Sequence, residues 1–339
     1  MPTVRPVRFF HVIGKISRMN VSVVIPTYRR PQLLIKCLNA LQKQTFETDQ
    51  YEIIVVSDGP DPATEEAIRD LGMRQPIKFL QLPHKGGPAA ARNYGWKNSI
   101  GNLVLFTDDD CLPDANWIRS FWNSFLRRPY AEAAFSGHTV VPIPPVPTDY
   151  ELNISHLATA EFITANCACT RATLITTDGF DEAFTMAWRE DSDFQFRLWE
   201  KSIPLFHVDD AVVTHPVRKA KWGVCLKEEK KGMFNALLFK KFPDMYRKKI
   251  QPHPPWLYYC ILLSVVTSIC GLIAGLSWLT YSGVIAWLLL TSLFVMKRLK
   301  ATSHDPIHIA EMIITSMAIP FLSLYWRWYG AIKYRTLLI

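Results

Sequence analysis

The chain has 339 residues, of which 49% are hydrophobic and 20% are charged, and its formal net charge is +8 at pH 7. This length allows one large or two modest domains, and the hydrophobic content lies between the values typical of soluble and membrane proteins. Basic residues gather at 218–249 and near the C-terminus, without the interleaved aromatic pattern of a nucleic-acid surface. The charge therefore indicates anionic membrane lipid as a partner, and not nucleic acid.

The cysteines and the first 20 residues predict that the α/β part of the chain stays in the cytosol. Seven cysteines are scattered along the chain, and the spacing of Cys167 and Cys169 fits neither a zinc site nor a thioredoxin motif. They predict buried free thiols in a reducing compartment. Residues 1–20 carry basic side chains but lack a signal-peptide core and cleavage site, so we expect a frayed lead-in.

Residues 21–126 alternate between short apolar runs and helical segments. This spacing is typical of βαβ units and predicts an α/β fold with a doubly wound, mainly parallel sheet. Strands are expected at 21–25, 52–57, 77–82 and 103–106, with helices at 31–43, from 61, at 89–99 and from 113.

Residues 133–218 break this regular pattern. A strand is expected near 133–141, and the proline-rich stretch 142–147 suits a mobile loop over a site. The remaining expected elements are helices starting near 170 and 190, and two short strands at 205–208 and 212–215.

Three consecutive carboxylates, Asp108 to Asp110, follow the apolar run 103–106. Like charges this close together are tolerable only in water or around a cation. Ligands of open α/β sheets lie outside the carboxyl ends of the strands, which is where this cluster falls. The cluster predicts either a divalent-metal site that holds a nucleotide diphosphate or a solvated acidic turn that caps the next helix.

Residues 256–296 are almost uniformly apolar and long enough for two membrane spans of about 20 residues each. We expect the spans near 256–275 and 279–296. The preceding basic segment, 219–255, is predicted to lie against the membrane as an amphipathic region. The chain therefore divides into four expected regions: a lead-in at 1–20, an α/β domain at 21–218, this juxtamembrane region, and membrane or interfacial helices at 256–339.

The basic clusters set the expected topology. Those before Trp256, at 297–300 and at 333–335 all belong on the cytosolic face by the positive-inside rule. Two spans satisfy this arrangement. The less apolar segment 307–327 is then re-entrant or interfacial, although a third crossing stays open.

Six short motifs follow one another in the first 220 residues: Val24–Tyr28, Val56–Gly59, Gly86–Asn93, Asp108–Asp110, Gly179–Glu182 and Glu190–Asp193. In order and spacing they resemble those of the family-2 glycosyltransferases of the membrane-anchored bacterial type. The resemblance implies the GT-A fold, which is doubly wound and Rossmann-like, followed by a C-terminal membrane helical region. It also implies inverting sugar transfer.

The resemblance implies a donor-binding set along the strand ends. Tyr28 would stack on uracil and Asp58 would accept from its imide N–H, although helix-entry packing and helix capping are structural alternatives. Gly86 and Gly87 would let the backbone approach the ligand closely. The donor-side residues implied are Pro26, Thr27, Tyr28, Arg30, Asp58, Gly86, Gly87, Arg92, Asn93, Asp108 and Asp109.

The acidic triplet and one histidine match the family's metal site. Asp110 would bind Mn²⁺ or Mg²⁺ directly, since both cations accept oxygen ligands. Asp108 would contact the ribose or a metal-bound water, while Asp109 should point to the other side of the strand extension. His215 lies where some members place a histidine ligand, and a structural histidine is the alternative.

Asp191 matches the family's general base, which takes the proton of the attacking acceptor hydroxyl. Glu190 and Asp193 would be its neighbours, or would serve only as first-turn acids that suit the helix dipole. Trp188 is either a platform for the acceptor sugar or a core tryptophan.

The implied activity is transfer of a single sugar, because the chain lacks the Gln-x-x-Arg-Trp motif of processive synthases. We expect a UDP-linked donor and a lipid-linked acceptor of cell-surface glycan biosynthesis. The enzyme would lie at the inner membrane with its catalytic domain in the cytoplasm. Two alternatives remain: transfer onto polyprenyl phosphate, which needs no base, and a non-catalytic sugar-nucleotide-binding scaffold of a glycan-assembly complex.

Overall fold

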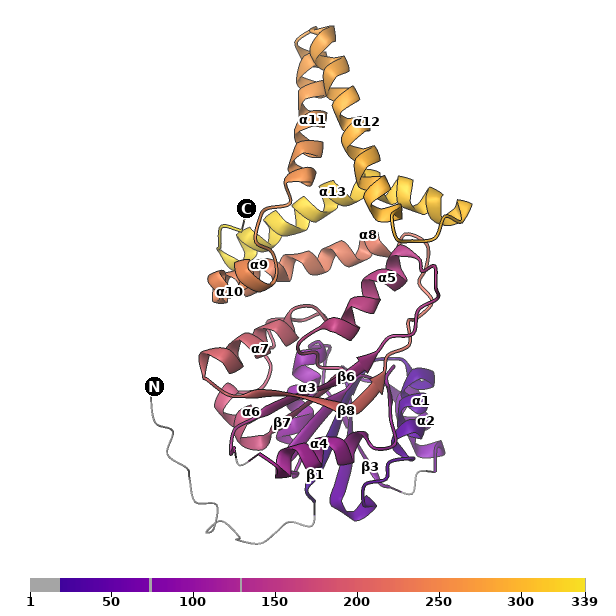
Figure 1. Cartoon of the computed structure of the whole chain (residues 1–339), viewed down its shortest axis with the longest axis vertical. Coiled ribbons are helices and arrows are strands. Elements are labelled where there is room, and N and C mark those ends of the chain that lie inside the picture. The colour runs from indigo at the N-terminus through magenta and orange to yellow at the C-terminus, as the bar shows by residue number, and fades with distance from the viewer. Residues whose placement is uncertain (1–18, 73–74, 129, 339) are drawn as a thin grey trace. The chain divides into compact units, whose positions relative to one another are not determined.

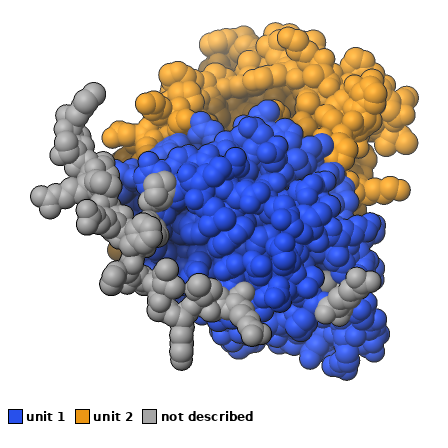
Figure 2. All heavy atoms as spheres, turned by 60° about the horizontal axis from the view of Figure 1, so that its bottom comes forward, with its two compact units in different colours: residues 1–140, 157–216 blue, residues 141–156, 217–339 orange. Residues whose placement is uncertain are grey.

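The computed structural model describes residues 19–72, 75–128 and 130–338, so nearly all of the expected lead-in lies outside the described residues. The chain forms two compact units (Figure 2). Unit 1 comprises residues 1–140 and 157–216, and unit 2 comprises residues 141–156 and 217–339.

Unit 1 is built on one eight-stranded sheet with the order β3-β2-β1-β4-β7-β6-β8-β5. Strands β1 to β4 are mutually parallel, β7 is antiparallel to both β4 and β6, and β8 runs parallel to β6. The predicted doubly wound, mainly parallel sheet is confirmed. The strands are β1 (Val21–Thr27), β2 (Tyr51–Ser57), β3 (Ile77–Gln81), β4 (Leu103–Thr107), β5 (Leu112–Pro113), β6 (Ala134–Val140), β7 (Asn166–Thr170) and β8 (Leu205–Thr214).

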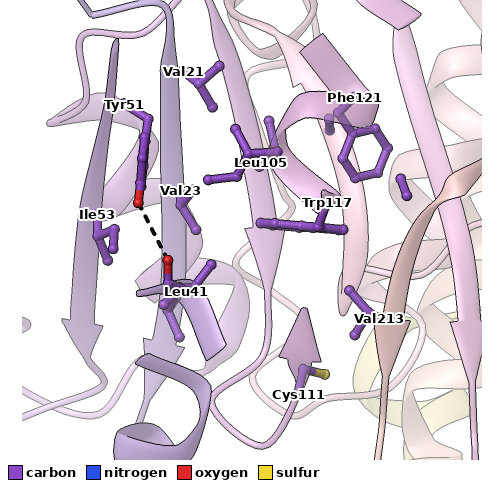
Figure 3. Close-up of a cluster of buried hydrophobic side chains, with 14 of the residues drawn as sticks. Val21, Val23, Leu41, Tyr51, Ile53, Leu105, Cys111, Trp117, Phe121 and Val213 are labelled. Carbon is purple, nitrogen blue, oxygen red and sulfur yellow. Dashed lines mark hydrogen bonds between the residues drawn. The ribbon is translucent and has the colours of Figure 1, made fainter. Parts of the chain in front are cut away.

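Helices cover both faces of this sheet. Successive side chains of a strand point to opposite faces, so Val23 and Val24 of β1 enter two different buried clusters. The cluster around Val23 includes Trp117 and Phe121 of one helix (Figure 3). The helices of unit 1 are α1 (Pro31–Leu41), α2 (Pro62–Asp70), α3 (Pro88–Lys97), α4 (Trp117–Leu126), α6 (Arg171–Thr177) and α7 (Glu190–Glu200).

Three local expectations differ from the structure. Residues 112–113 do not open a helix but pair with β8, and α4 starts only at Trp117. The two short strands expected at 205–215 form the single strand β8, which is interrupted opposite Gly137 and His138 by a register shift. Strand β7 has the sequence Asn-Cys-Ala-Cys-Thr, which lacks a strong strand pattern, and it forms because both its neighbours pair with it.

Unit 2 is helical. Helices α11 and α12 pack as a hairpin, and α13 runs across the base of that hairpin alongside α8 and α9 (Figure 1). By length and apolar composition, α11, α12 and α13 could each cross a membrane. The helices are α5 (Asp149–Ser155), α8 (Val224–Glu228), α9 (Met233–Lys241), α10 (Pro243–Lys249), α11 (Trp256–Ile273), α12 (Ser277–Leu299) and α13 (Pro306–Tyr334).

Candidate active site

The acidic turn after β4, Asp108 to Asp110, is bonded to the end of β1 and to the residues that follow it. The side chain of Asp109 is fully buried, accepts a hydrogen bond from the Thr27 hydroxyl at 2.7 Å, and pairs with Arg30 at 3.0 Å. Burial raises the pKa of Asp109 to about 7, although Arg30 and Thr27 oppose that rise. Asp109 therefore joins the two loops, while the predicted donor contacts of Thr27 and Arg30 stay predictions.

Arg92 connects the acidic turn to the start of α7. Its guanidinium is buried and lies 2.7 Å from the Asp108 carboxylate and 3.3 Å from the Glu190 carboxylate. Burial alone would raise the pKa of Asp108, but the charge and hydrogen bond of Arg92 outweigh it and hold that pKa below its usual value. The predicted acids at 108 and 190, 82 positions apart in sequence, thus share one buried cation.

Asp110 and His215 come together as the metal prediction requires. An Asp110 oxygen lies 3.7 Å from His215 Nε2, and Cys111 completes a group whose potential ligand atoms all lie within 4.8 Å of one another. His215 Nδ1 is buried and has no hydrogen-bond partner among the described residues.

The donor set of this group fits Mn²⁺ or Mg²⁺ through Asp110, with His215 better suited to Mn²⁺. Cys111 was not predicted, because nothing in the sequence marks it. It is fully buried, and burial raises the pKa of its thiol well above the usual value. A protonated thiol is a poor ligand, so the predicted ligands of the metal stay Asp108, Asp110 and His215, without Cys111.

Asp58 holds the glycine loop that was predicted to approach the donor. One of its carboxylate oxygens accepts hydrogen bonds from the N–H groups of Gly86 and Gly87 at 2.7 and 2.8 Å. Gly87 has φ = +96°, a conformation that favours glycine. Beside this loop, the Lys85 ammonium lies 4.4 Å from the centre of the Tyr28 ring. The base-binding roles of Tyr28 and Asp58 stay predictions.

Asn93 has a structural task. Its amide nitrogen donates to the Phe180 carbonyl and to the Glu182 carboxylate, both at 2.8 Å. Its amide oxygen accepts from the Phe180 N–H and the Trp96 indole. These four bonds use the whole hydrogen-bonding capacity of the amide. The structure therefore favours a role for Asn93 in holding the 179–182 loop, and not the predicted nucleotide contact.

Asp191 is half-buried in the first turn of α7, where it accepts a hydrogen bond from the Ser192 N–H at 2.6 Å. Burial raises its pKa. The neighbouring Glu190 has its pKa raised to about 7 by burial and then by the Asp191 charge, which together outweigh Arg92. Both acids thus hold their protons more tightly than free carboxylates, as a proton-accepting site requires.

The remaining predicted acceptor-side residues, Asp193 and Trp188, have different surroundings. Asp193 is fully buried, accepts a hydrogen bond from Arg197 Nε and forms an ion pair with that guanidinium, which also donates to two carbonyls of the 177–179 turn. This favours the structural alternative for Asp193. Trp188 is half-buried, with the Arg189 guanidinium 4.6 Å from its ring centre, and its role as a sugar platform stays a prediction.

Residues 22–151 match the family described as glycosyl transferase family 2. Glycosyltransferase AglE of Haloferax volcanii is 36% identical over 99 residues, which are 29% of this chain and 33% of that protein. Chondroitin synthase of Escherichia coli is 27% identical over 68% of this chain and 39% of its own length. A validoxylamine A glucosyltransferase of Streptomyces hygroscopicus subsp. jinggangensis is 25% identical, over 71% and 63% of the two chains.

Two solved structures share the fold. The mannosyltransferase PcManGT of Pyrobaculum calidifontis, in complex with GDP-Man and Mn²⁺, has a TM-score of 0.55 at 16% identity over 91% of this chain and 88% of that one. Staphylococcus aureus TarS 1–349, in complex with UDP-GlcNAc, has a TM-score of 0.51 at 16% identity over 92% of both chains. The chain spans less than two thirds of the curated relatives named above. The family match is confined to residues 22–151, which hold strands β1 to β4 and the acidic turn after β4, and the solved structures extend the likeness of fold over most of the chain.

Proposed function

We propose that this protein is an inverting glycosyltransferase that moves one sugar from a UDP-sugar to a membrane-associated, lipid-linked acceptor in cell-surface glycan biosynthesis. The observation that carries the proposal is the buried Arg92 bridge. It connects Asp108, on the predicted donor side, to Glu190, the residue next to the predicted base. A single buried arginine thus holds the proposed donor side and the proposed acceptor side together.

The donor side is suited to a nucleotide diphosphate. Asp108, Asp110 and His215 would hold Mn²⁺ or Mg²⁺, which would supply the charge that stabilises the departing diphosphate. Tyr28 would stack on the base, and the glycine loop held by Asp58 would bring backbone N–H groups close to the donor. PcManGT, which shares the fold, binds Mn²⁺ with its donor, and this supports the same assignment here.

The acceptor side is suited to proton removal. Asp191 would accept the proton of the acceptor hydroxyl as that oxygen attacks the anomeric carbon opposite the leaving group. Its raised pKa makes it a stronger base than an ordinary aspartate. Trp188 would present an aromatic face to the acceptor.

The apolar helices of unit 2 support a lipid-linked acceptor. Its long apolar helices have the length and composition of membrane spans, and an enzyme held at a bilayer meets its acceptor there. We propose the inner membrane as the location, with unit 1 in the cytoplasm, because the basic clusters flanking the apolar helices belong on that side.

The test is a screen of nucleotide sugars against the full chain in lipid with membrane-extract acceptors, read out as UDP release and product formation. The key variant is Asp191→Asn, which keeps the shape of the side chain but cannot take a proton. We expect it to lower turnover ~10²–10⁴-fold while leaving the UDP dissociation constant almost unchanged. The control is Glu200→Gln, an exposed acid at the other end of the same helix.

Three results would contradict the proposal in different ways. Wild-type turnover by Asp191→Asn would remove the base and favour polyprenyl phosphate as the acceptor, since an anionic acceptor needs no deprotonation. UDP binding with no turnover for any donor would favour a scaffold. Turnover that resists a metal chelator would remove the metal assignment.

A further inference from the structure

Helix α13 packs on the charged helices of unit 2 along most of its length. Near its start the Glu311 carboxylate accepts a hydrogen bond from the Gly223 N–H at 2.6 Å. Further along, the Ser323 hydroxyl bonds the Glu229 carboxylate. Near its end, a Cβ on Gly330 would lie 2.4 Å from the Met233 carbonyl oxygen, so the two backbones are in direct contact.

The partner segment is too polar for the hydrocarbon of a bilayer. A charged side chain at the centre of a membrane helix costs about 2.5–3.5 kcal/mol or more. If α13 crossed the bilayer, the helices packed on it would be drawn to the same depth. The ionisable residues of this segment are Lys227, Glu228, Glu229, Lys230, Lys231, Lys240, Lys241, Asp244, Arg247, Lys248 and Lys249.

The two faces of α13 differ in character. The face that packs within unit 2 is mixed: the polar or small residues His308, Thr315, Ser316, Arg327 and Gly330 alternate with the apolar residues Met312, Ile319, Pro320 and Leu324. The outward face carries exposed apolar or aromatic side chains: Ile307, Ile314, Met317, Tyr325, Trp328 and Ile332. A helix that exposes its apolar stripe while it packs polar groups inward is the reverse of a helix that faces water.

We infer that α13 does not cross the membrane but lies flat in the bilayer interface. Its outward stripe enters the boundary between headgroups and acyl chains, and the basic helices α8 to α10 rest on its aqueous side. This inference rests on the proposed membrane location of unit 2. It leaves the α11–α12 hairpin as the two-span anchor and makes α13 the surface that contacts lipid at the headgroup level.

Helix length agrees with this assignment. The 29 residues of α13 extend about 43 Å at 1.5 Å per residue, whereas a spanning helix needs only about 20 residues. Pro320 within the helix also falls on the face that packs against the protein. Aromatic residues such as Tyr325, Trp326, Trp328 and Tyr329 gather in its last third, and tyrosine and tryptophan favour the interface over the hydrocarbon.

The test measures the depth of spin labels along the helix in the full chain, reconstituted into vesicles of phosphatidylethanolamine and phosphatidylglycerol. The background carries serine at Cys225, Cys260 and Cys270, the cysteines that are not buried. Single cysteines replace Ile307, Ile314, Met317, Tyr325 and Ile332 in turn. A control ladder on α11 replaces Leu263, Val266 and Ile269, which are exposed on that helix. Relative accessibility to oxygen and to a water-soluble nickel chelate gives the depth.

We expect one shallow depth for all five α13 labels and a graded depth along the α11 ladder. Depths that pass through the bilayer midplane along α13 would overturn the inference, and so would water exposure of every α13 label. If the α11 ladder is also in water, the proposed membrane location fails as well, so the two failures are distinguishable.

A second measurement does not depend on labels within the helix. Cysteines placed at exposed Ala301 and Leu337 flank α13 on its two sides in sequence. With an impermeant maleimide in sealed, oriented vesicles, we expect both to react from the same side. Reaction from opposite sides would mean that α13 crosses.

Discussion

The two halves of unit 1 differ in how they are built. Residues 21–126 form parallel strands joined by helices, and strand ends alone bring Thr27, Asp58 and Asp108–Asp110 to one edge. Residues 134–214 are held by a mixture of antiparallel and parallel pairs and by long-range side-chain bonds, such as those from Asn93 to the 179–182 loop.

The first half therefore has a geometry set mainly by backbone hydrogen bonds, and the second half has one set in part by individual side chains. A parallel βαβ edge is fixed by backbone hydrogen bonds, which any strand-forming sequence supplies. The loops that carry Asp181 to Asp191 depend instead on particular side chains, so single substitutions can move them. We expect donor binding to be robust to changes in the second half, and acceptor chemistry to be sensitive to them.

The largest effect is expected from a substitution in the first half of unit 1, at the acidic turn. Asp110→Ala removes a proposed metal ligand, so we expect turnover to fall on the order of 10³-fold and metal-dependent UDP binding to weaken with it. Calorimetry with UDP and Mn²⁺, and UDP release during turnover, measure the two effects. Asp70→Ala, an exposed acid at the end of α2, is the control. Unchanged metal binding would place the cation elsewhere.

The next largest effect is expected from removing Arg92, which connects the two halves of unit 1. Arg92→Met leaves the buried Glu190 and the partly exposed Asp108 without their cation, which we expect to cost about 3–5 kcal/mol of unfolding free energy and ~10²-fold in turnover.

The exposed Arg69–Glu65 pair provides the matched control, because Arg69→Met should cost about 0–1 kcal/mol. Adding Glu190→Gln to Arg92→Met should restore part of the stability. Full additivity of the two changes in urea unfolding would show that the bridge is not a coupled contact.

The pH dependence sharpens the assignment of the base. Because the pKa values of Glu190 and Asp191 are raised, we expect turnover to drop about tenfold per pH unit below the pKa of the pair. Glu190→Gln removes a neighbouring negative charge, so the pKa of Asp191 should fall and the acidic limb should move to lower pH. An acidic limb that stays in place would assign it to another group.

The contribution of Glu190 to stability should decrease as pH rises, whereas turnover should increase. Between the ordinary value of 4.5 and the folded value of about 7, native Glu190 holds a proton that the unfolded chain releases. Its contribution to the free energy of unfolding therefore decreases as pH rises through about 7. Urea unfolding of the wild type and of Glu190→Gln at pH 5 and pH 8 measures this contribution.

The smallest expected effect concerns Asn93. Asn93→Ala removes four hydrogen bonds, three of them buried, and should lower the unfolding free energy by about 1–3 kcal/mol, with little change in the UDP dissociation constant. Exposed Asn123 on α4 is the control site. A selective loss of UDP affinity would instead return Asn93 to the nucleotide site.

The sequence predicted the first half well because apolar runs and turn residues recur there at short range. Strands β1 to β4 and the shared edge needed only hydrophobic pattern and strand polarity. The roles of Asn93 and Asp109 could not be predicted, since each depends on a partner brought close by tertiary packing: Phe180 and Thr27. Asp193 pairs instead with Arg197 of the same helix, a local i,i+4 contact that the sequence contains. A motif shows that a polar residue matters, but not whether it faces a ligand or the protein.

One glycine limits how the proposed acceptor side could be redesigned. A Cβ on Gly87 would lie 2.6 Å from the carbonyl oxygen of Thr185. The glycine loop, which is proposed to approach the donor, and the loop that leads to the proposed base therefore fit together with no room for a methyl group. An engineer who grafts a foreign 181–188 loop to change the acceptor would have to reproduce the backbone path at position 185, whatever side chains the new loop carries.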